Sequence, residues 1–268
     1  EAVMPALQAL VEIVGRIDLR DPSSARSRAL SLCPEAPGAR FALDSALHEI
    51  AAQVEGVSLA DYLARGSGSE AMKDCAVNAL VSGSSSEELK VSVEKARAQG
   101  FSDLKLKLGA RTWEDDLARV RVLREAAGPE ARLRLDMGAS WSRSEAALRL
   151  PLLAEFGIDL IEQPLPAADL AGMVALRVQT RSLGIHLAAD ESIVGPADAR
   201  RVIEHGAADI LVLKPAALGG LAAAAELATA GHKAGLACVV TSLIDSAWGR
   251  ASALALACAL PGSRPADG

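Results

Sequence analysis

The sequence contains few aromatic residues, cysteines or histidines. Only 3% of its 268 residues are aromatic, and the four histidines are far apart. The four cysteines form no CxxC pair and no Cys/His ligand spacing, which argues against both a zinc site and a disulfide framework. We interpret these cysteines as small core residues: Cys33, Cys75, Cys238 and Cys258.

The sequence also lacks basic clusters and long apolar runs. Its 28 basic and 34 acidic residues give a net charge of −6, and the basic ones are scattered, so no surface for a nucleic-acid backbone is indicated. The longest apolar stretch, Ala253 to Leu260, is far short of a membrane span, and EAVMPALQAL has no basic n-region or cleavage site. We expect a soluble, cytoplasmic protein without nucleic-acid or membrane partners; formation of a homo-oligomer is left open.

From Val77 onward, short apolar strands alternate with amphipathic helices, a pattern typical of parallel α/β folds. A chain of this length can bury a large core, and charged residues recur at every strand end rather than at one switch point, which favours a (β/α) barrel over an open sheet. Seven strands are expected, at 77–81, 103–108, 132–136, 159–162, 186–190, 209–214 and 237–241. Helices are expected between them at 113–126, 144–156, 168–183, 197–205 and 221–234.

The first part of the chain has helical periodicity at residues 4–16 and more strongly at 40–53. A Gly/Ser-rich linker follows around Gly66. We therefore expect a helical region at 1–72 and a barrel at 73–268. An eighth strand is not visible, so the first and seventh strands are expected to expose unpaired edges and the chain alone to behave poorly in solution.

Charged residues end five successive apolar runs. Lys107, Asp136, Glu162, Asp190 and Lys214 are separated by 29, 26, 28 and 24 residues, about the length of one strand and one returning helix. Each should therefore lie at the same end of successive parallel strands, where barrel enzymes carry their active sites.

Three converging carboxylates repel one another and need a cation, and all-oxygen ligands favour a hard ion: Mg²⁺, with Mn²⁺ as a second choice. Lys105 and Lys107 are two residues apart and should share one face of a strand, where neighbouring positive charges lower the pKa of an amine. Lys214, four strands later, should face them. This pattern indicates removal of a proton α to the carboxylate of a small-molecule substrate, the metal stabilising an enediolate.

Other interpretations were weighed. A single lysine or aspartate at a strand end is usually a solvated loop residue, but barrel interiors are normally filled with branched aliphatic side chains, so five such residues in five units favour a functional site. A Schiff-base aldolase using Lys214 leaves the carboxylates unexplained. A non-catalytic remnant that keeps the barrel motifs also stays open.

The motifs KLKLG, RLDMGASW, IEQPL, ADES and LKPAALGG, in this order, resemble the muconate lactonising subgroup of the enolase superfamily, and most of all its o-succinylbenzoate synthases. The resemblance covers roughly residues 39–261. It implies a (β/α) barrel with a capping region, in which Asp136, Glu162 and Asp190 bind Mg²⁺, Lys107 is the acid/base assisted by Lys105, and Lys214 lies on the opposite face. Three residues are implied near the substrate: Gly219, Ser242 and Asp245.

The implied reaction is the loss of water from a cyclohexadiene carboxylate to give o-succinylbenzoate for menaquinone synthesis, which makes the protein a lyase. N-acylamino acid racemases and dipeptide epimerases are the nearest alternatives, and a muconate-type cycloisomerase is a further one. This chain departs from the family pattern at Asp136-Met137-Gly138, where the family usually has Asp-x-Asn. It also lacks a recognisable N-terminal three-stranded sheet.

Overall fold

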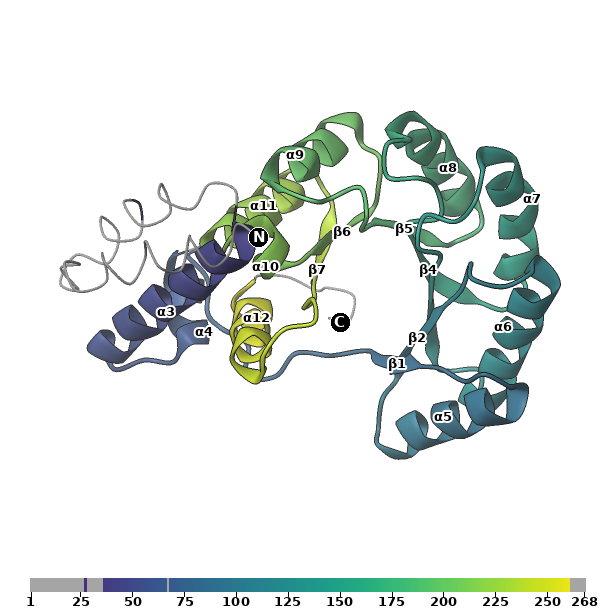
Figure 1. The fold of residues 1–268 in the computed structure, drawn as a ribbon, viewed down its shortest axis with the longest axis horizontal. Helices are drawn as coiled ribbons and strands as arrows, with labels where there is room; N and C mark the ends of the chain where they lie inside the picture. The colour runs from purple at the N-terminus through teal and green to yellow at the C-terminus, as the bar shows by residue number, and fades with distance from the viewer. Residues whose placement is uncertain (1–26, 28–35, 67, 261–268) are drawn as a thin grey trace.

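The computed structural model describes residue 27, residues 36–66 and residues 68–260, and the following account is confined to them. Seven parallel strands form one sheet in the order β1 to β7. The sheet curls into a half-barrel, and the helices α5 to α9 and α11 cover its convex outer face (Figure 1). The strands are β1 (Ala79–Val81), β2 (Asp103–Lys107), β3 (Arg132–Asp136), β4 (Ile158–Glu162), β5 (His186–Ala189), β6 (Ile210–Leu213) and β7 (Ala237–Val240).

Ten helices are found in the described residues, and most of them connect consecutive strands. They are α3 (Pro37–Glu55), α4 (Leu59–Gly66), α5 (Ser86–Ala98), α6 (Trp113–Ala127), α7 (Arg143–Ala154), α8 (Leu170–Ser182), α9 (Pro196–His205), α10 (Pro215–Leu218), α11 (Leu221–Lys233) and α12 (Ala247–Ala259). The expected α/β fold with seven visible barrel strands is confirmed. The helix expected at residues 4–16 and Cys33 lie outside the described residues.

The helices begin where the sequence supplies capping side chains. The hydroxyl groups of Ser85, Thr112 and Ser142 accept hydrogen bonds from backbone N–H groups in the first turns of α5, α6 and α7. These bonds satisfy donors that a helix N-terminus would otherwise leave without partners. The capping residues fix the point at which each strand-to-helix loop ends, and so fix the loops that carry the strand-end residues.

Two apolar layers hold the half-barrel together. The larger one lies between the sheet and its helices and includes Leu104, Leu106, Leu133 and Leu135, all buried. A smaller cluster lies on the concave side and consists of Leu160, Ala188, Ile210, Val212 and Val239. Because side chains alternate along a strand, the residues between the outward-facing leucines of β2 and β3 point to the concave side. These are charged residues.

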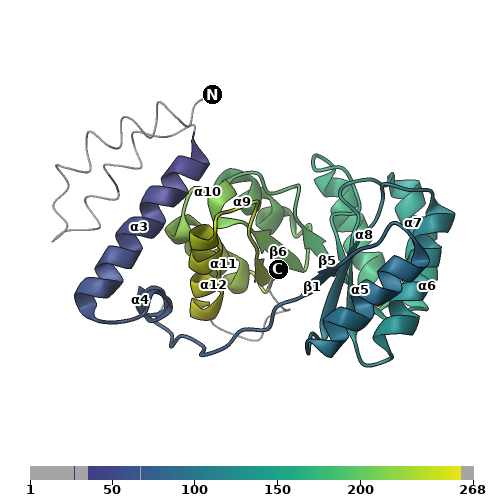
Figure 2. The same cartoon turned by 60° about the horizontal axis from the view of Figure 1, so that its bottom comes forward.

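Helices α3 and α4 lie on the side of the half-barrel that carries α10, α11 and α12, away from α5 to α8 (Figure 2). The carboxylate of Asp44 on α3 accepts a hydrogen bond of 3.2 Å from the backbone N–H of Ala222, in the first turn of α11. It lies against Gly220, where a Cβ atom would come within 2.6 Å of Asp44 Oδ2. Asp44 therefore caps α11 from another helix. The expected division at residue 72 stays a prediction.

Strands β1 and β7 form the two ends of the sheet within the described chain and do not pair with each other. Leu80 of β1 is 66% exposed, which is unusual for a leucine in a barrel strand. None of the helices in the described ranges is long and apolar enough to cross a membrane.

Candidate active site

The register of the sheet places the predicted residues at one rim. Lys107 of β2 pairs with Asp136 of β3, and Asp136 pairs with Glu162 of β4. Asp190 directly follows β5, and Lys214 directly follows β6. Strands β2 and β6 lie on opposite arms of the curl, with β4 between them (Figure 1). The five residues thus come from five neighbouring strands and from the same end of each.

Lys105 holds two of the carboxylates. Its Nζ lies 2.8 Å from both carboxylate oxygens of Glu162 and 3.0 Å from Oδ2 of Asp136. Lys105 pairs in register with Arg134, so it starts below Asp136 and its long side chain reaches up to the rim. Burial would lower the pKa of Lys105, but the attraction of Glu162 and Asp136 outweighs it and raises that pKa. The expectation that neighbouring lysines lower one another's pKa is therefore wrong for Lys105.

Lys107 is in a different environment. Its side chain is exposed, and no ion pair is found for it among the described residues. A Cβ atom on Gly138 would lie 3.7 Å from Lys107 Cε and 3.9 Å from Glu191 Oε1, so the three residues are neighbours. Of the two lysines, Lys105 is the one paired with carboxylates, whereas Lys107 is exposed beside Gly138.

The third carboxylate pairs with the lysine on the other arm. Asp190 Oδ1 lies 2.5 Å from Lys214 Nζ and receives no hydrogen bond of regular geometry from the residues described. The side chain of Asp190 is almost fully buried and that of Lys214 is partly exposed. This ion pair holds the Lys214 ammonium group at the rim.

Glu162 is the carboxyl group whose pKa the site raises to a value near neutral pH. Burial, and after it the nearby charges of Asp136 and Asp190, raise its pKa to about 7, even though Lys105 pulls in the opposite direction. The pKa of Glu191 is also raised, by burial and by the neighbouring charge of Asp190. The rim thus concentrates more negative charge than its two paired lysines neutralise.

This donor set fits a hard divalent cation, since all three predicted ligands are carboxylates. The geometry is not that of a finished metal centre, however. In the described part of the chain, no group of three or more His, Cys, Asp or Glu side chains is arranged to hold a metal ion. Two of the carboxylates form ion pairs with Lys105 and the third with Lys214 instead. Metal ligation by Asp136, Glu162 and Asp190 therefore stays a prediction.

The residues expected near the substrate are less directly placed. Gly219, which has a φ of +84°, is buried under the side chain of Arg40 from α3. Asp245 turns back on its own loop, and its Oδ2 accepts a hydrogen bond of 3.2 Å from the Leu243 backbone N–H. Ser242 lies partly buried beyond β7. Their contact with a substrate stays a prediction.

Sequence reasoning did not assign roles to several polar residues on the same strands. Gln163 is fully buried directly after Glu162, and Glu191 follows Asp190. Arg134 is buried one layer below the rim and pairs with Asp103 at 3.3 Å. The sequence could have placed Asp103 and Arg134 on the concave face, because they lie two residues before Lys105 and Asp136, respectively, and side chains two apart on a strand share a face.

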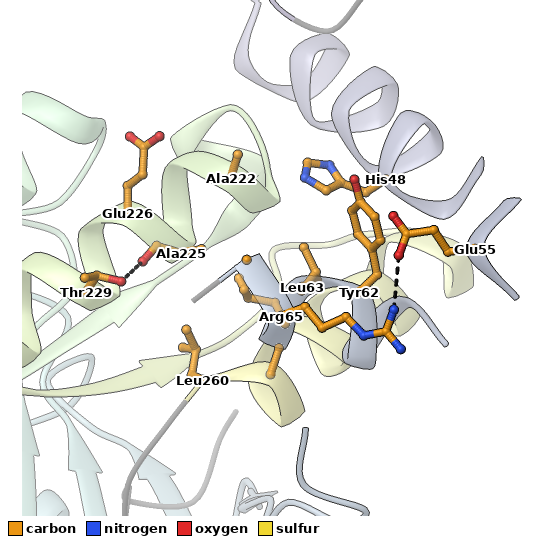
Figure 3. A pocket seen from close by; sticks show the side chains of 13 residues that line it. His48, Glu55, Tyr62, Leu63, Arg65, Ala222, Ala225, Glu226, Thr229 and Leu260 are labelled. Atoms are coloured by element: carbon orange, nitrogen blue, oxygen red, sulfur yellow. Dashed lines mark hydrogen bonds and ion pairs between the residues drawn. The ribbon is translucent and has the colours of Figure 1, made fainter. Parts of the chain in front are cut away.

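One well-formed cavity lies away from the rim. It has a volume of about 780 Å³ and is bordered by α3, α4, α11 and α12, with His48, Tyr62, Thr229 and Leu260 among its lining residues (Figure 3). An ion pair of 3.1 Å between Arg65 and Glu55 lies at its edge. None of the predicted site residues lines it, so its size does not identify the active site.

Comparison with known proteins identifies the family of the chain. Residues 88–267 match the family model described as enolase C-terminal domain-like. A chloromuconate cycloisomerase of Cupriavidus necator is 32% identical over 83% of this chain and 59% of its own length. An o-succinylbenzoate synthase of Thermobifida fusca is 38% identical over 59% of this chain and 48% of its own. An L-Lys-D/L-Arg epimerase of Methylococcus capsulatus is 36% identical over 87% of this chain and 64% of its own.

Solved structures give the same result. A dipeptide epimerase of Methylococcus capsulatus complexed with Mg ion has a TM-score of 0.82 at 33% identity, covering 94% of this chain and 70% of that one. A dipeptide epimerase of Enterococcus faecalis complexed with Mg and the dipeptide L-Leu-L-Tyr has a TM-score of 0.87 at 25% identity, covering 98% and 73%. The chain spans less than two thirds of each of the three curated relatives. It belongs to the enolase C-terminal domain-like family, whose members similar to it are enzymes of the muconate lactonising type.

Proposed function

We propose that this chain carries the catalytic half of an enzyme that removes a proton α to the carboxylate of a small molecule. The observation that carries this proposal is the rim itself: three carboxylates and three lysines, from strands β2 to β6, with amines on both arms of the half-barrel. A barrel interior has no structural need for six charged groups at one end.

The contacts of the three lysines suggest a different role for each. Lys107 is the exposed amine at the mouth and takes the α-proton at its Nζ. Lys105 keeps Asp136 and Glu162 in place and partly neutralised. Lys214, fixed by Asp190, lies on the other arm and either faces the developing negative charge or returns a proton to the opposite side of the substrate.

Asp136, Glu162 and Asp190 would hold a Mg²⁺ ion, with Mn²⁺ as a substitute. When bound, the ion would offset the negative charge that grows on the substrate carboxylate as the α-proton leaves. Magnesium in two of the similar epimerase structures supports this assignment.

Two reactions share this first step. Dehydration to o-succinylbenzoate, a lyase reaction of menaquinone synthesis, is the reaction that the sequence motifs favour, and a 38% identical relative supports it. Epimerisation of a dipeptide or an N-acylamino acid is the second candidate. It is supported by a 36% identical epimerase that aligns over 87% of this chain, and by the presence of a lysine on each arm, which inversion at one carbon requires.

The test is a pair of parallel assays with Mg²⁺ in deuterated water: formation of o-succinylbenzoate, and exchange of the α-proton in L- and D-dipeptides. Lys107→Ala should abolish whichever activity is found. Lys214→Ala should abolish epimerisation as well. Asp190→Asn should weaken Mg²⁺ binding, measured by calorimetry. Full activity in Lys107→Ala would contradict the proposal, and Mg²⁺ binding without any α-proton exchange would favour a non-catalytic remnant.

A further inference from the structure

Gln163 has an unusual backbone conformation beside the site. It directly follows Glu162, its side chain is fully buried, and its φ is +39°. A residue other than glycine at positive φ is strained and persists only when its surroundings hold it there. Something must therefore stabilise this conformation.

The side-chain amide of Gln163 uses its complete hydrogen-bonding capacity. Nε2 donates to the backbone carbonyl of Leu165 at 2.9 Å and to Oγ of Ser192 at 2.8 Å. Oε1 accepts from the backbone N–H groups of Asp190 at 2.9 Å and of Ser192 at 3.0 Å. A carboxamide offers two donors and two acceptor positions, so no other side chain of this size satisfies all four partners.

The backbone of Gln163 adds two more connections. Its N–H donates to the carbonyl of Ala188 at 2.9 Å, and its carbonyl accepts from the N–H of Ala139 at 2.7 Å. One residue thus joins the ends of three strands: β3 through Ala139, β4 through itself, and β5 through Ala188 and Asp190. These are the strands that carry the three predicted metal ligands.

We propose that Gln163 is the positioning residue that fixes the backbone of Asp190 relative to Glu162, and thereby the spacing of the carboxylates at the rim. The expected effect on Mg²⁺ binding rests on the proposed metal-dependent function. The hydrogen bonds that position Asp190 do not depend on it. Gln163 is buried beneath the rim and contacts no substrate, so it acts through Asp190.

Gln163→Glu is the most direct test, because it keeps the size of the side chain and replaces the two donors of Nε2 by an oxygen that faces two acceptors. We expect Mg²⁺ binding, measured by calorimetry, to weaken by about tenfold or more. Gln179→Glu is the matched control, since Gln179 on α8 is a partly exposed glutamine whose Nε2 donates to one carbonyl, that of Ala147, at 3.0 Å. It should leave Mg²⁺ binding unchanged.

Ser192→Ala distinguishes positioning from general loss of packing. It removes the bond from Nε2 to Oγ but leaves both bonds from Oε1 to the backbone. It should therefore keep Mg²⁺ affinity within about threefold. A folded Gln163→Glu protein that binds Mg²⁺ as the unmodified chain does, or an equal loss in Ser192→Ala, would overturn the proposal.

Hydrogen exchange in EDTA separates this inference from the proposed function. The amides of Asp190 and Ser192 should be protected in the unmodified chain. In Gln163→Glu they should exchange about tenfold faster, because the new oxygen is repelled by the Leu165 carbonyl and draws the side chain, with Oε1, away from both amides. Unchanged protection in that variant rejects the role of Gln163, whether or not metal binds. If protection is lost as expected but the unmodified chain binds no Mg²⁺, the positioning role is upheld and the metal-dependent function fails.

Discussion

Lys105 Nζ lies 2.8 Å from both carboxylate oxygens of Glu162, although the register of the sheet places Lys107, and not Lys105, in the same row as Glu162. The lower lysine reaches upward and becomes the counter-ion, which leaves the upper lysine with its amine at the mouth. The two lysines of the K-x-K motif thus differ in environment: Lys105 is paired with carboxylates, and Lys107 is the exposed amine that the proposed function uses as the base.

Lys105→Met should therefore destabilise the protein in EDTA. It leaves Asp136 and Glu162 close together and buried without their shared cation, at a cost of about 2–3 kcal/mol, which is limited because Glu162 can take up a proton. Excess Mg²⁺ should restore part of the loss. Urea unfolding monitored by circular dichroism measures both effects.

Lys90→Met on α5 is the control for this change. Lys90 is 3.9 Å from Glu94, and both side chains are about half exposed, so its removal should alter the free energy of unfolding by less than about 0.5 kcal/mol. Equal stability of Lys105→Met and the unmodified chain in EDTA would refute the assignment of Lys105 as counter-ion.

The pH dependence of stability should depend in part on Asp103, at the opposite end of β2 from the rim. Burial alone would raise its pKa, but hydrogen bonds from Arg132 and Ser102 and the charge of Arg134 outweigh it and lower the pKa below 3.8. A carboxyl group whose pKa is lowered on folding stabilises the protein above its unfolded pKa, and this contribution is lost as the pH falls through the folded pKa.

Asp103→Asn should therefore cost about 2 kcal/mol at pH 7. The difference between this variant and the unmodified chain should shrink as the pH is lowered from about 5 to below the folded pKa of Asp103. Urea titrations at a series of pH values measure it. A difference that stays constant over this range would show that the loss is not electrostatic.

Two glycines with similar φ angles allow steric contact to be compared with backbone strain. Gly109 has a φ of +86°, and a Cβ atom there would come within 2.2 Å of Ser140 Oγ and 2.7 Å of the Met137 carbonyl oxygen. Gly128 has a φ of +80°, and its Cβ would meet nothing within 4 Å. Gly128→Ala should cost about 1 kcal/mol, through strain alone.

Gly109→Ala should cost more, about 2–4 kcal/mol, because the clash is with backbone and with a short side chain that must move. Thermal unfolding of the two variants side by side gives the comparison. Equal melting temperatures would indicate that the loop after β2 is free to shift, contrary to the structure.

Gly138 leaves a space between Lys107 and Glu191, at the position where the resemblance to the muconate lactonising subgroup implies an asparagine. A Cβ atom there meets only ordinary van der Waals contacts, and asparagine tolerates the φ of +53° better than most residues. Gly138→Asn should tighten Mg²⁺ binding by about tenfold through the added amide. Gly138→Ala introduces the same backbone strain without the amide, and should not tighten Mg²⁺ binding. Calorimetry distinguishes the two, and equal affinities would reject the role of the amide.

The rim could be predicted from the sequence because strand ends and charge coincide there. Asp136 and Glu162 end β3 and β4, and the expected bounds of β3 agree with the structure at both ends. No bounds were expected for α5 and α12, although both occupy the positions after β1 and β7 at which the alternation of strands and helices calls for a helix.

The partners of each lysine could not be predicted in the same way. Alternation along β2 puts Lys105 and Lys107 on one face, but which of them reaches the carboxylates depends on the stagger between neighbouring strands. The four bonds of Gln163 depend on a positive φ and on the path of the loop after β5, neither of which has a sequence signature at a glutamine.

The cap that Asp44 places on α11 joins residues 178 positions apart in the chain. The first turn of α11, which follows the loop after Lys214, cannot be completed until α3 has docked. Long-range closure of this kind is slow. In refolding, the segment around Lys214 should therefore gain its native order late, after the contacts among β2, β3 and β4 have formed.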